Sequence, residues 1–231
     1  MDHVLDNPAW NALTTGNCSL ANGNNDVKYF SNEVSPFVGF KTNNDESFKT
    51  LYELLPHSGP IGFISAMQVD IPAQWDILQT IKCFQMVFEG SATSTLDANI
   101  VSLSEEHVGQ MLALTKLTNP GPFAEKTINF GHYRGIFEGD RLAAMAGQRL
   151  HAGNYAEISA VCTHPDFLGR GYARQLLMHH VNRIQAASNI PYLHVRHDNH
   201  RAVSVYESLG FVTRREIYFY ILKKAVTATS K

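Results

Sequence analysis

A short loop at residues 168–173 offers the clearest place for chemistry in this sequence. It lies between an apolar stretch and a segment whose apolar residues recur at helical spacing. The start of a helix presents backbone N–H groups without helical partners and a partial positive charge, and both attract phosphate. Gly169 and Gly171 let the backbone approach such an anion without a Cβ in the way. The loop therefore predicts an anion-binding helix N-terminus.

Two common phosphate-binding motifs and one hydrolase motif do not fit this sequence. A dinucleotide fingerprint needs a third glycine where Arg174 stands, and no Gly-Lys-Ser/Thr follows the loop as a P-loop requires. The G-x-S-x-G turn of serine hydrolases is also missing. These gaps disfavour a nucleotide-dependent oxidoreductase and leave serine hydrolysis without a nucleophile.

A second constellation follows the loop, with the pattern N-x-x-A-x-x-x-Y-x-x-x-G-F from Asn199 through Tyr206 to Phe211. Ahead of the loop runs Val161-Cys162-Thr163-His164-Pro165. Together these segments resemble the GNAT superfamily of acyl-CoA-dependent N-acetyltransferases, over about residues 100–221. Leu168 departs from the pattern, because the family usually has Gln or Arg there. The change should weaken cofactor binding rather than abolish it, because backbone amides supply much of that binding in the family.

The resemblance implies a fold, a cofactor and a set of site residues. The fold is α/β, a mixed and mostly antiparallel central sheet flanked by helices, and acetyl-CoA is the acyl donor. The backbones at 161–163 would pair with pantetheine, the amides of 169–174 would hold the pyrophosphate, and Asn199 would contact pantetheine. Tyr206 would protonate the departing thiolate. The implied cofactor-binding residues are Val161, Cys162, Thr163, Gly169, Arg170, Gly171, Tyr172, Ala173, Arg174 and Asn199.

Two residues qualify as the catalytic base. Glu157 lies fourteen positions before Gly171, where histone-type members of the family carry a glutamate. His194 lies five positions before Asn199, at the glutamate of members that acetylate ribosomal-protein N-termini. Imidazole accepts a proton at neutral pH, whereas a carboxylate would need burial or a water to do so. The spacing to the glycine loop slightly favours Glu157, and both residues stay candidates.

No metal site is expected. His194, His197 and His200 recur every third residue, but they would fall on a strand, a loop and a helix start, with no acid or cysteine completing a set.

The second half of the chain shows regular elements. Strands are expected at 100–103, 133–137, 142–150, 155–163 and 192–196, with one or two more from Phe211 onward. Helices are expected from Ser104 to about Leu117, over 173–184 and over 201–209. Strands alternating with helices at these lengths predict an α/β layer structure.

The first half is less regular. Expected strands lie at 34–40, 61–69 and 81–88, and a helix capped by Ser47 runs through Leu55. A small polar linker is expected at 91–95. We therefore predict two units, residues 1–95 and 96–231. The opening residues 5–10 look like the start of bacterial GNAT proteins whose N-terminal half is a degenerate acetyltransferase-like unit.

Composition narrows the function classes. The 231 residues carry a formal net charge of −2, which disfavours bulk nucleic-acid binding, and no apolar run approaches a membrane span. Three scattered cysteines and the absence of a signal-peptide pattern suggest a cytoplasmic protein. The expected acceptor is a small amine, an amino acid or a peptide N-terminus, and a homodimer stays open. The alternative function is a catalytically silent CoA-binding or protein-interaction module.

Overall fold

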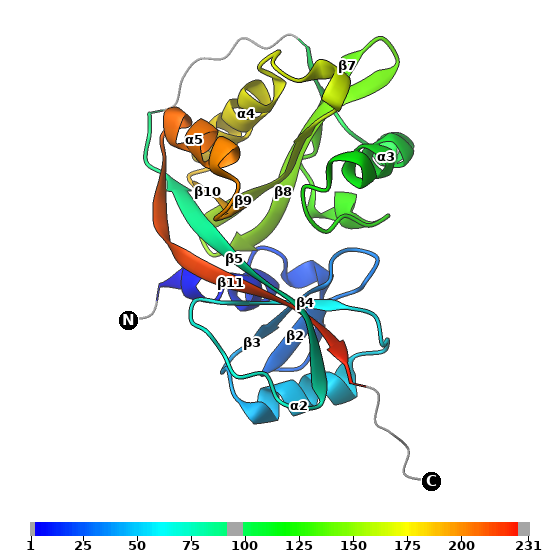
Figure 1. Cartoon of the computed structure of the whole chain (residues 1–231), viewed down its shortest axis with the longest axis vertical. Helices are drawn as coiled ribbons and strands as arrows, with labels where there is room; N and C mark the ends of the chain where they lie inside the picture. The colour runs from blue at the N-terminus through cyan, green and yellow to red at the C-terminus, as the bar shows by residue number, and fades with distance from the viewer. Residues whose placement is uncertain (1–2, 92–98, 226–231) are drawn as a thin grey trace.

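The computed structural model describes residues 3–91 and 99–225, and within them eleven strands form one sheet (Figure 1). The strands are β1 (Ala21–Gly23), β2 (Val27–Phe30), β3 (Phe37–Phe40), β4 (Ile61–Ser65), β5 (Trp75–Phe88), β6 (Ile100–Ser102), β7 (Arg134–Glu138), β8 (Arg141–Ala152), β9 (Tyr155–Thr163), β10 (Ile190–Arg196) and β11 (Phe211–Lys224). Their order in the sheet is β1-β2-β3-β4-β11-β5-β10-β9-β8-β7-β6. The β3–β4 and β9–β10 pairs are parallel and the other neighbouring pairs are antiparallel, which confirms the predicted mixed, mostly antiparallel sheet.

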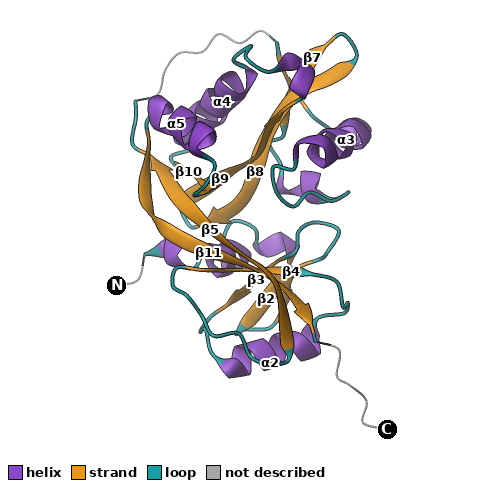
Figure 2. Cartoon of the chain, viewed as in Figure 1, coloured by secondary structure: helices purple, strands orange, loops and turns teal. Residues whose placement is uncertain are grey.

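Helices flank this sheet (Figure 2). They are α1 (Pro8–Thr14), α2 (Asp45–Leu54), α3 (Val108–Thr118), α4 (Tyr172–Ala186) and α5 (His200–Leu209). The upper part of the view holds α4 and α5 close together with α3 across the sheet from them, whereas α2 lies at the bottom. Short 3₁₀ helices occupy Val4–Asp6, Cys18–Leu20, Glu105–His107, Thr127–Phe130 and Pro165–Phe167.

The two predicted units share the sheet. β5, from the first half of the sequence, lies between β10 and β11, which both come from the second half. β11 in turn pairs with β4 over Tyr218–Leu222, so the C-terminal strand completes the N-terminal part of the sheet. Figure 1 shows β5 and β11 running together from the upper part of the molecule to the lower part. The predicted linker at 91–95 falls, apart from Ser91, outside the described residues.

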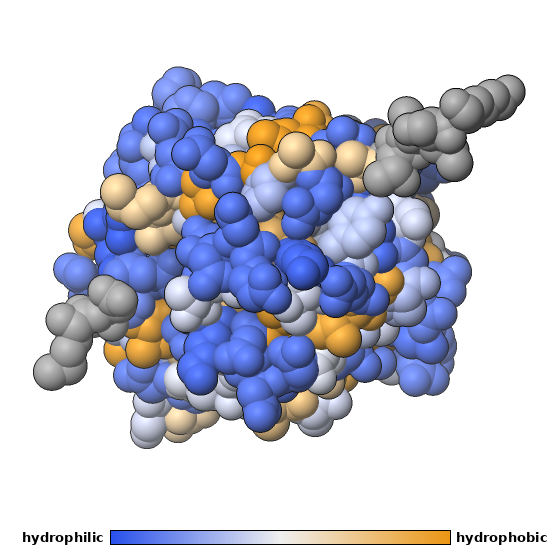
Figure 3. Space-filling view, turned by 90° about the horizontal axis from the view of Figure 1, so that it is seen from below, coloured by the Kyte–Doolittle hydropathy of each residue, from blue (hydrophilic) through white to orange (hydrophobic). Residues whose placement is uncertain are grey.

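Buried apolar residues form several separate clusters against this sheet. One cluster packs β5, β9 and β10 against α4 and α5, with Leu177, Val181 and Leu193 among its members. A second holds α2 against the lower strands through Phe48, Phe63 and other aromatic rings. The lower face in Figure 3 is mainly hydrophilic, with hydrophobic residues in small separate areas. The apolar residues that recur at helical spacing in 173–184, among them Leu177 and Val181, form the buried face of α4.

Several predicted boundaries shift for identifiable reasons. The cap of α2 is Asn44 rather than Ser47, because the Asn44 Oδ1 accepts from the Ser47 backbone N–H at 2.9 Å. β5 begins at Trp75, six residues before the predicted start. Residues 76–80 are exposed, so the strand shows no alternation of buried and exposed side chains there. The residues from Phe211 onward form one long strand, with a register shift between Thr213 and Arg215.

Candidate active site

The strands β9 and β10 part from each other at the centre of the sheet. Their parallel pairing runs only from Ile190 opposite Tyr155 to Tyr192 opposite Glu157. Beyond that point β9 continues to Thr163 and is paired on one side only, with β8. Ala160 has a positive φ of 53°, and the register with β8 shifts between Ser159 and Cys162, as a β-bulge requires. The backbone after the bulge thus has an open edge facing the gap.

The glycine loop follows β9 and opens α4. Gly169 and Gly171 have φ values of 80° and 78°, in the left-handed region that glycine tolerates best. A Cβ built on either glycine would meet no atom within 4 Å, so the space above the loop is open. Gly171 is the N-cap of α4 and no side chain caps the helix. The first N–H groups of α4 are therefore available to an anion, as the sequence predicts.

A cavity of about 450 Å³ joins these features. All ten predicted cofactor-binding residues line it, and so does Tyr206. Other lining residues are Phe167, Leu168, Leu177, Arg201, Ala202 and Val205. The open edge of β9, the start of α4 and the side of α5 therefore face one common space.

Tyr206 is a half-buried residue of α5 and packs against Phe211, with ring centroids 6.0 Å apart. Burial raises the pKa of its phenol to about 12, so the hydroxyl keeps its proton at neutral pH. Asn199 caps the same helix, because its Oδ1 accepts from the Ala202 backbone N–H at 3.2 Å. Its Nδ2 is left as the side-chain donor for a ligand. The spacing from Asn199 to Tyr206 is thus set by one helix.

Two side chains of the loop region, those of Arg170 and Tyr172, form hydrogen bonds to one carboxylate. Arg170 donates from Nη1 to Glu138 Oε1 at 3.0 Å, and its guanidinium lies 5.1 Å from the centre of the Phe167 ring. The Tyr172 hydroxyl donates to the same carboxylate. Arg174 is exposed on the first turn of α4. Glu138 therefore offsets one of the two positive charges at the loop.

Glu157 and His194 belong to a sealed polar network next to the point where β9 and β10 part. Glu157 is fully buried, and Arg149 donates to both of its oxygens at 2.9 and 2.5 Å. The Leu150 backbone N–H and His194 Nδ1 also contact this carboxylate, at 3.3 and 2.7 Å. Burial alone would raise the pKa of Glu157, but the adjacent Arg149 and His194 lower it to about 2. Glu157 is thus held as an anion whose oxygens are already engaged.

The second ring nitrogen of His194 faces Gln85. The two Nε2 atoms lie 3.0 Å apart, while Gln85 Nε2 also donates to the Leu5 carbonyl at 2.8 Å. Because Gln85 Oε1 accepts from Arg214 at 2.7 Å, the amide orientation is fixed by its neighbours. His194 therefore carries its proton on Nδ1 and donates it to Glu157, and its Nε2 accepts from Gln85. Neither Glu157 nor His194 lines the cavity.

Comparison with known proteins gives two kinds of match. Residues 133–220 match the model of the family described as FR47-like protein. A crystal structure of a GNAT-family protein from Novosphingobium aromaticivorans DSM 12444 is 33% identical over 97% of this chain and 100% of the other, with a TM-score of 0.90. The chain belongs to the GNAT family. It is therefore an acyltransferase, and its fold implies the use of an acyl-CoA.

More distant GNAT structures share the fold alone. A GCN5-related N-acetyltransferase from Kribbella flavida has a TM-score of 0.60 at 11% identity, covering 96% of this chain and 97% of the other. A second from Sphaerobacter thermophilus has a TM-score of 0.51 at 10% identity, covering 82% and 72%. No curated protein matches the chain. The structures from Novosphingobium aromaticivorans and Kribbella flavida each align over nearly the whole of this chain. The N-terminal half is therefore part of an architecture that they share.

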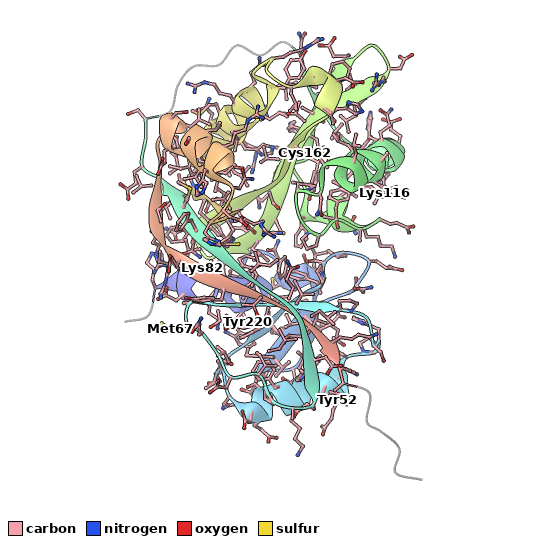
Figure 4. All side chains as sticks on the ribbon, viewed as in Figure 1. Tyr52, Met67, Lys82, Lys116, Cys162 and Tyr220 are labelled. Carbon is pink, nitrogen blue, oxygen red and sulfur yellow. The ribbon has the colours of Figure 1, made fainter. Side chains whose placement is uncertain are left out.

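Other features of this GNAT chain bear on its chemistry. Burial raises the pKa of the Cys162 thiol to about 11, so this cysteine of β9 (Figure 4) is a poor nucleophile at neutral pH. No group of three metal-ligating side chains occurs among the described residues. His197 contacts the Lys82 carbonyl, whereas His194 points into the sealed network. Within the described ranges, no helix is long and apolar enough to cross a membrane.

Arg149 and Gln85 are the site neighbours that the sequence did not single out. Arg149 lies in the otherwise mostly apolar stretch of β8, and its side chain is 9% exposed. A lone arginine in such a strand is a signal for a buried acid partner, because buried charges need pairing. Gln85 lies on β5 and shows no comparable signal.

Proposed function

We propose that this GNAT protein is an N-acetyltransferase that moves an acetyl group from acetyl-CoA to a primary amine by direct attack. One observation carries the proposal: a single cavity joins the open edge of β9, the uncapped start of α4 and the hydroxyl-bearing face of α5. Each part suits one portion of an acyl-CoA. A small amine, an amino acid and a peptide N-terminus are the acceptor classes to test.

The open loop and the free strand edge support this placement of the donor. The pyrophosphate would lie against the amides of Gly169 to Arg174, where the missing Cβ atoms leave open space. The pantetheine arm would pair with the free backbone edge at Val161 to Thr163, and Asn199 Nδ2 would donate to it. Leu168 lines the cavity and offers no hydrogen bond, so backbone amides carry the anion binding here.

The reaction forms a bond from the amine nitrogen to the acetyl carbonyl carbon and breaks the bond from that carbon to sulfur. Backbone N–H groups at the bulge of β9 would polarise the carbonyl as negative charge develops on its oxygen. Tyr206 would donate its proton to the departing thiolate. Its raised pKa keeps that proton in place until the thiolate forms.

The amine proton would pass to His194 rather than to Glu157. Glu157 is a weak base, because four contacts hold its anionic form and its pKa is about 2. It would instead fix the Nδ1–H tautomer of His194 and support the positive charge that the ring gains. For His194 Nε2 to accept the proton, the Gln85 amide must move aside.

A screen for free thiol released from acetyl-CoA, run against panels of amines, amino acids and peptides, tests the proposal. Acceptor-dependent release, with the acetyl group found on the acceptor nitrogen by mass spectrometry, is the expected result. Binding of CoA by calorimetry without acceptor-dependent release across the panels would indicate the catalytically silent module instead. Absence of CoA binding would contradict the assignment of the cavity.

A further inference from the structure

The second half of α4 holds buried polar atoms that the fold leaves unpaired. Both ring nitrogens of His180 and Nε of Arg183 are buried and have no hydrogen-bond partner within the described residues. His180 is completely buried. The Ala146 backbone favours protonation of the ring, but no ring nitrogen reaches hydrogen-bond geometry. Leaving a buried polar group without a hydrogen bond costs about 1–3 kcal/mol of folding free energy. A ligand that formed hydrogen bonds with these atoms would remove that cost.

Two arginines and a histidine gather at this place from three parts of the chain. Arg134 begins β7, Arg183 comes from α4, and His132 precedes β7 in an exposed loop. Arg183 Nη2 donates to Gln148 Oε1 at 2.6 Å, and Arg134 Nη1 donates to the Tyr133 carbonyl at 3.1 Å. Neither arginine forms an ion pair among the residues that the structure describes.

The pKa values of three groups in this cluster are lowered, as expected where positive charges lie near one another without an acid. Burial, followed by the charge of Arg134, lowers the pKa of Arg183 to about 10. Burial, followed by Arg183, lowers the pKa of His180 to about 3. His132 also has a lowered pKa, from partial desolvation of its ring and then from Arg183 and Arg134. No carboxylate contributes to any of these three shifts, so no acid offsets the cations.

The backbone before β7 is open at Gly131, which precedes His132 in the chain. A Cβ built on Gly131 would meet no atom within 4 Å. His132 adopts a φ of 59°, a left-handed conformation that is uncommon for residues other than glycine. The space is separate from the acyl-CoA cavity, because none of the cluster residues lines that cavity. Along α4, Gly171 and Arg183 are roughly 18 Å apart at 1.5 Å per residue.

Helix capping does not account for the cluster. Cations near a helix C-terminus are often stabilised by its terminal carbonyls. Here the backbone N–H groups of Ala187 and Asn189 bond the carbonyls of Arg183 and Ile184 at the end of α4. The guanidinium of Arg183 instead reaches Gln148 on β8. Its placement therefore points toward the sheet and the cluster, where a negative ligand would be bound.

We propose that Arg134, Arg183, His132 and His180 form a second ligand site, which binds a small oxyanion such as a phosphate or carboxylate group. The two guanidinium groups supply charge-assisted hydrogen bonds to its oxygens, and the imidazoles add N–H donors. Binding neutralises the repulsion between the two arginines and pairs donors that are otherwise buried without partners. The site is independent of the proposed acetyl transfer.

Histidine-selective NMR on the full chain tests the site directly. Inorganic phosphate and succinate are titrated separately, with sodium chloride at matched ionic strength as the third arm. Saturable shifts of the His132 and His180 ring resonances with either oxyanion, and none with chloride, are expected. The arm that saturates first identifies phosphate or carboxylate as the preferred group. Unmoved resonances, or equal movement with chloride, would overturn the proposal without any variant being needed.

Variants then locate the binding. Arg183→Gln and Arg134→Gln should each weaken oxyanion binding at least about tenfold, because each removes a charged donor. Arg141→Gln is the matched control: it removes one exposed arginine paired with Asp166 outside both sites, so affinity should stay within twofold. Equal affinity in all three variants would place the anion elsewhere. Circular dichroism confirms that each variant is folded before titration.

Discussion

The two halves of β9 differ in what surrounds them. In the first half, β8 and β10 pair with the strand on both sides, and Glu157 is sealed beneath them with Arg149 and His194. After the bulge at Ala160, the strand is paired on one side only and lines the cavity that we propose for acyl-CoA. One strand thus carries a buried ionic network and an open backbone edge. Changes in the sealed half should act on stability, whereas changes around the open half should act on rate and affinity.

The largest expected effect is on the open side. Tyr206→Phe should lower kcat about 10²–10⁴-fold, because it removes the proton donor for the leaving thiolate and nothing that binds the ground state. Stopped-flow or steady-state thiol release gives kcat, and calorimetry should show nearly unchanged acetyl-CoA affinity. An unaltered kcat under conditions where chemistry limits the rate would make Tyr206 a packing residue of α5.

In the sealed half, Glu157→Gln should reduce the free energy of unfolding by about 3–5 kcal/mol, because Arg149 is left as a buried charge without its counter-ion. Urea unfolding followed by fluorescence measures the loss. Asp166→Asn is the control, since it removes an exposed partner of Arg141 and should cost less than about 1 kcal/mol. Equal losses in the two variants would show that the network contributes no more than a surface pair.

The same network predicts a pH dependence of stability. The pKa of Glu157 falls from its ordinary value of 4.5 to about 2 in the folded protein. Its contribution to stability is therefore complete above about pH 4.5 and is lost as the pH falls toward 2. The difference in unfolding free energy between the wild type and Glu157→Gln should shrink through this range. A difference that stays constant between those pH values would contradict the assignment of the carboxylate as the titrating group.

His194 of β10 contacts Glu157 in the sealed half, and pH profiles test whether it also acts in the reaction. If it accepts the amine proton, activity should rise with pH through one ionisation, and kcat should fall about 10²-fold in His194→Gln with that limb lost. Glu157→Gln, measured where it is folded, should keep the limb. The opposite result would make Glu157 the base. Unchanged profiles and rates in both would mean that the amine enters already deprotonated.

The smallest expected effect concerns the loop. Gly171→Val should weaken CoA binding about tenfold or more, because its Cβ would enter the open anion seat and strain a backbone with φ of 78°. The thermal midpoint without ligand should fall by only a few degrees, since the loop is exposed. Calorimetry checks the affinity, and Gly139→Val, at an exposed hairpin turn with positive φ, is the matched strain control. Equal CoA affinity in the two variants would contradict the proposal that this loop binds the pyrophosphate.

Local sequence patterns predicted much of the C-terminal layer. β9 was predicted with its exact ends, and α4 and α5 to within one or two residues, because their apolar repeats match the buried faces of regular elements. The N-terminal half was harder to predict. β5 extends through an exposed stretch with no alternating pattern, and its neighbours in the sheet are more than 100 residues away in the chain.

The sequence alone predicted the glycine turn before α4, the helix that spaces Asn199 from Tyr206, and the resemblance to the GNAT family, because these depend on short-range patterns. The tertiary structure decided which of these groups meet. It sealed Glu157 beneath Arg149, an interaction across neighbouring strands that periodicity does not encode. It also placed Gln85 against His194 and brought Arg134 near Arg183 of α4. The accessibility and charge state of a side chain depend on neighbours from distant parts of the chain, so only the folded protein assigns them.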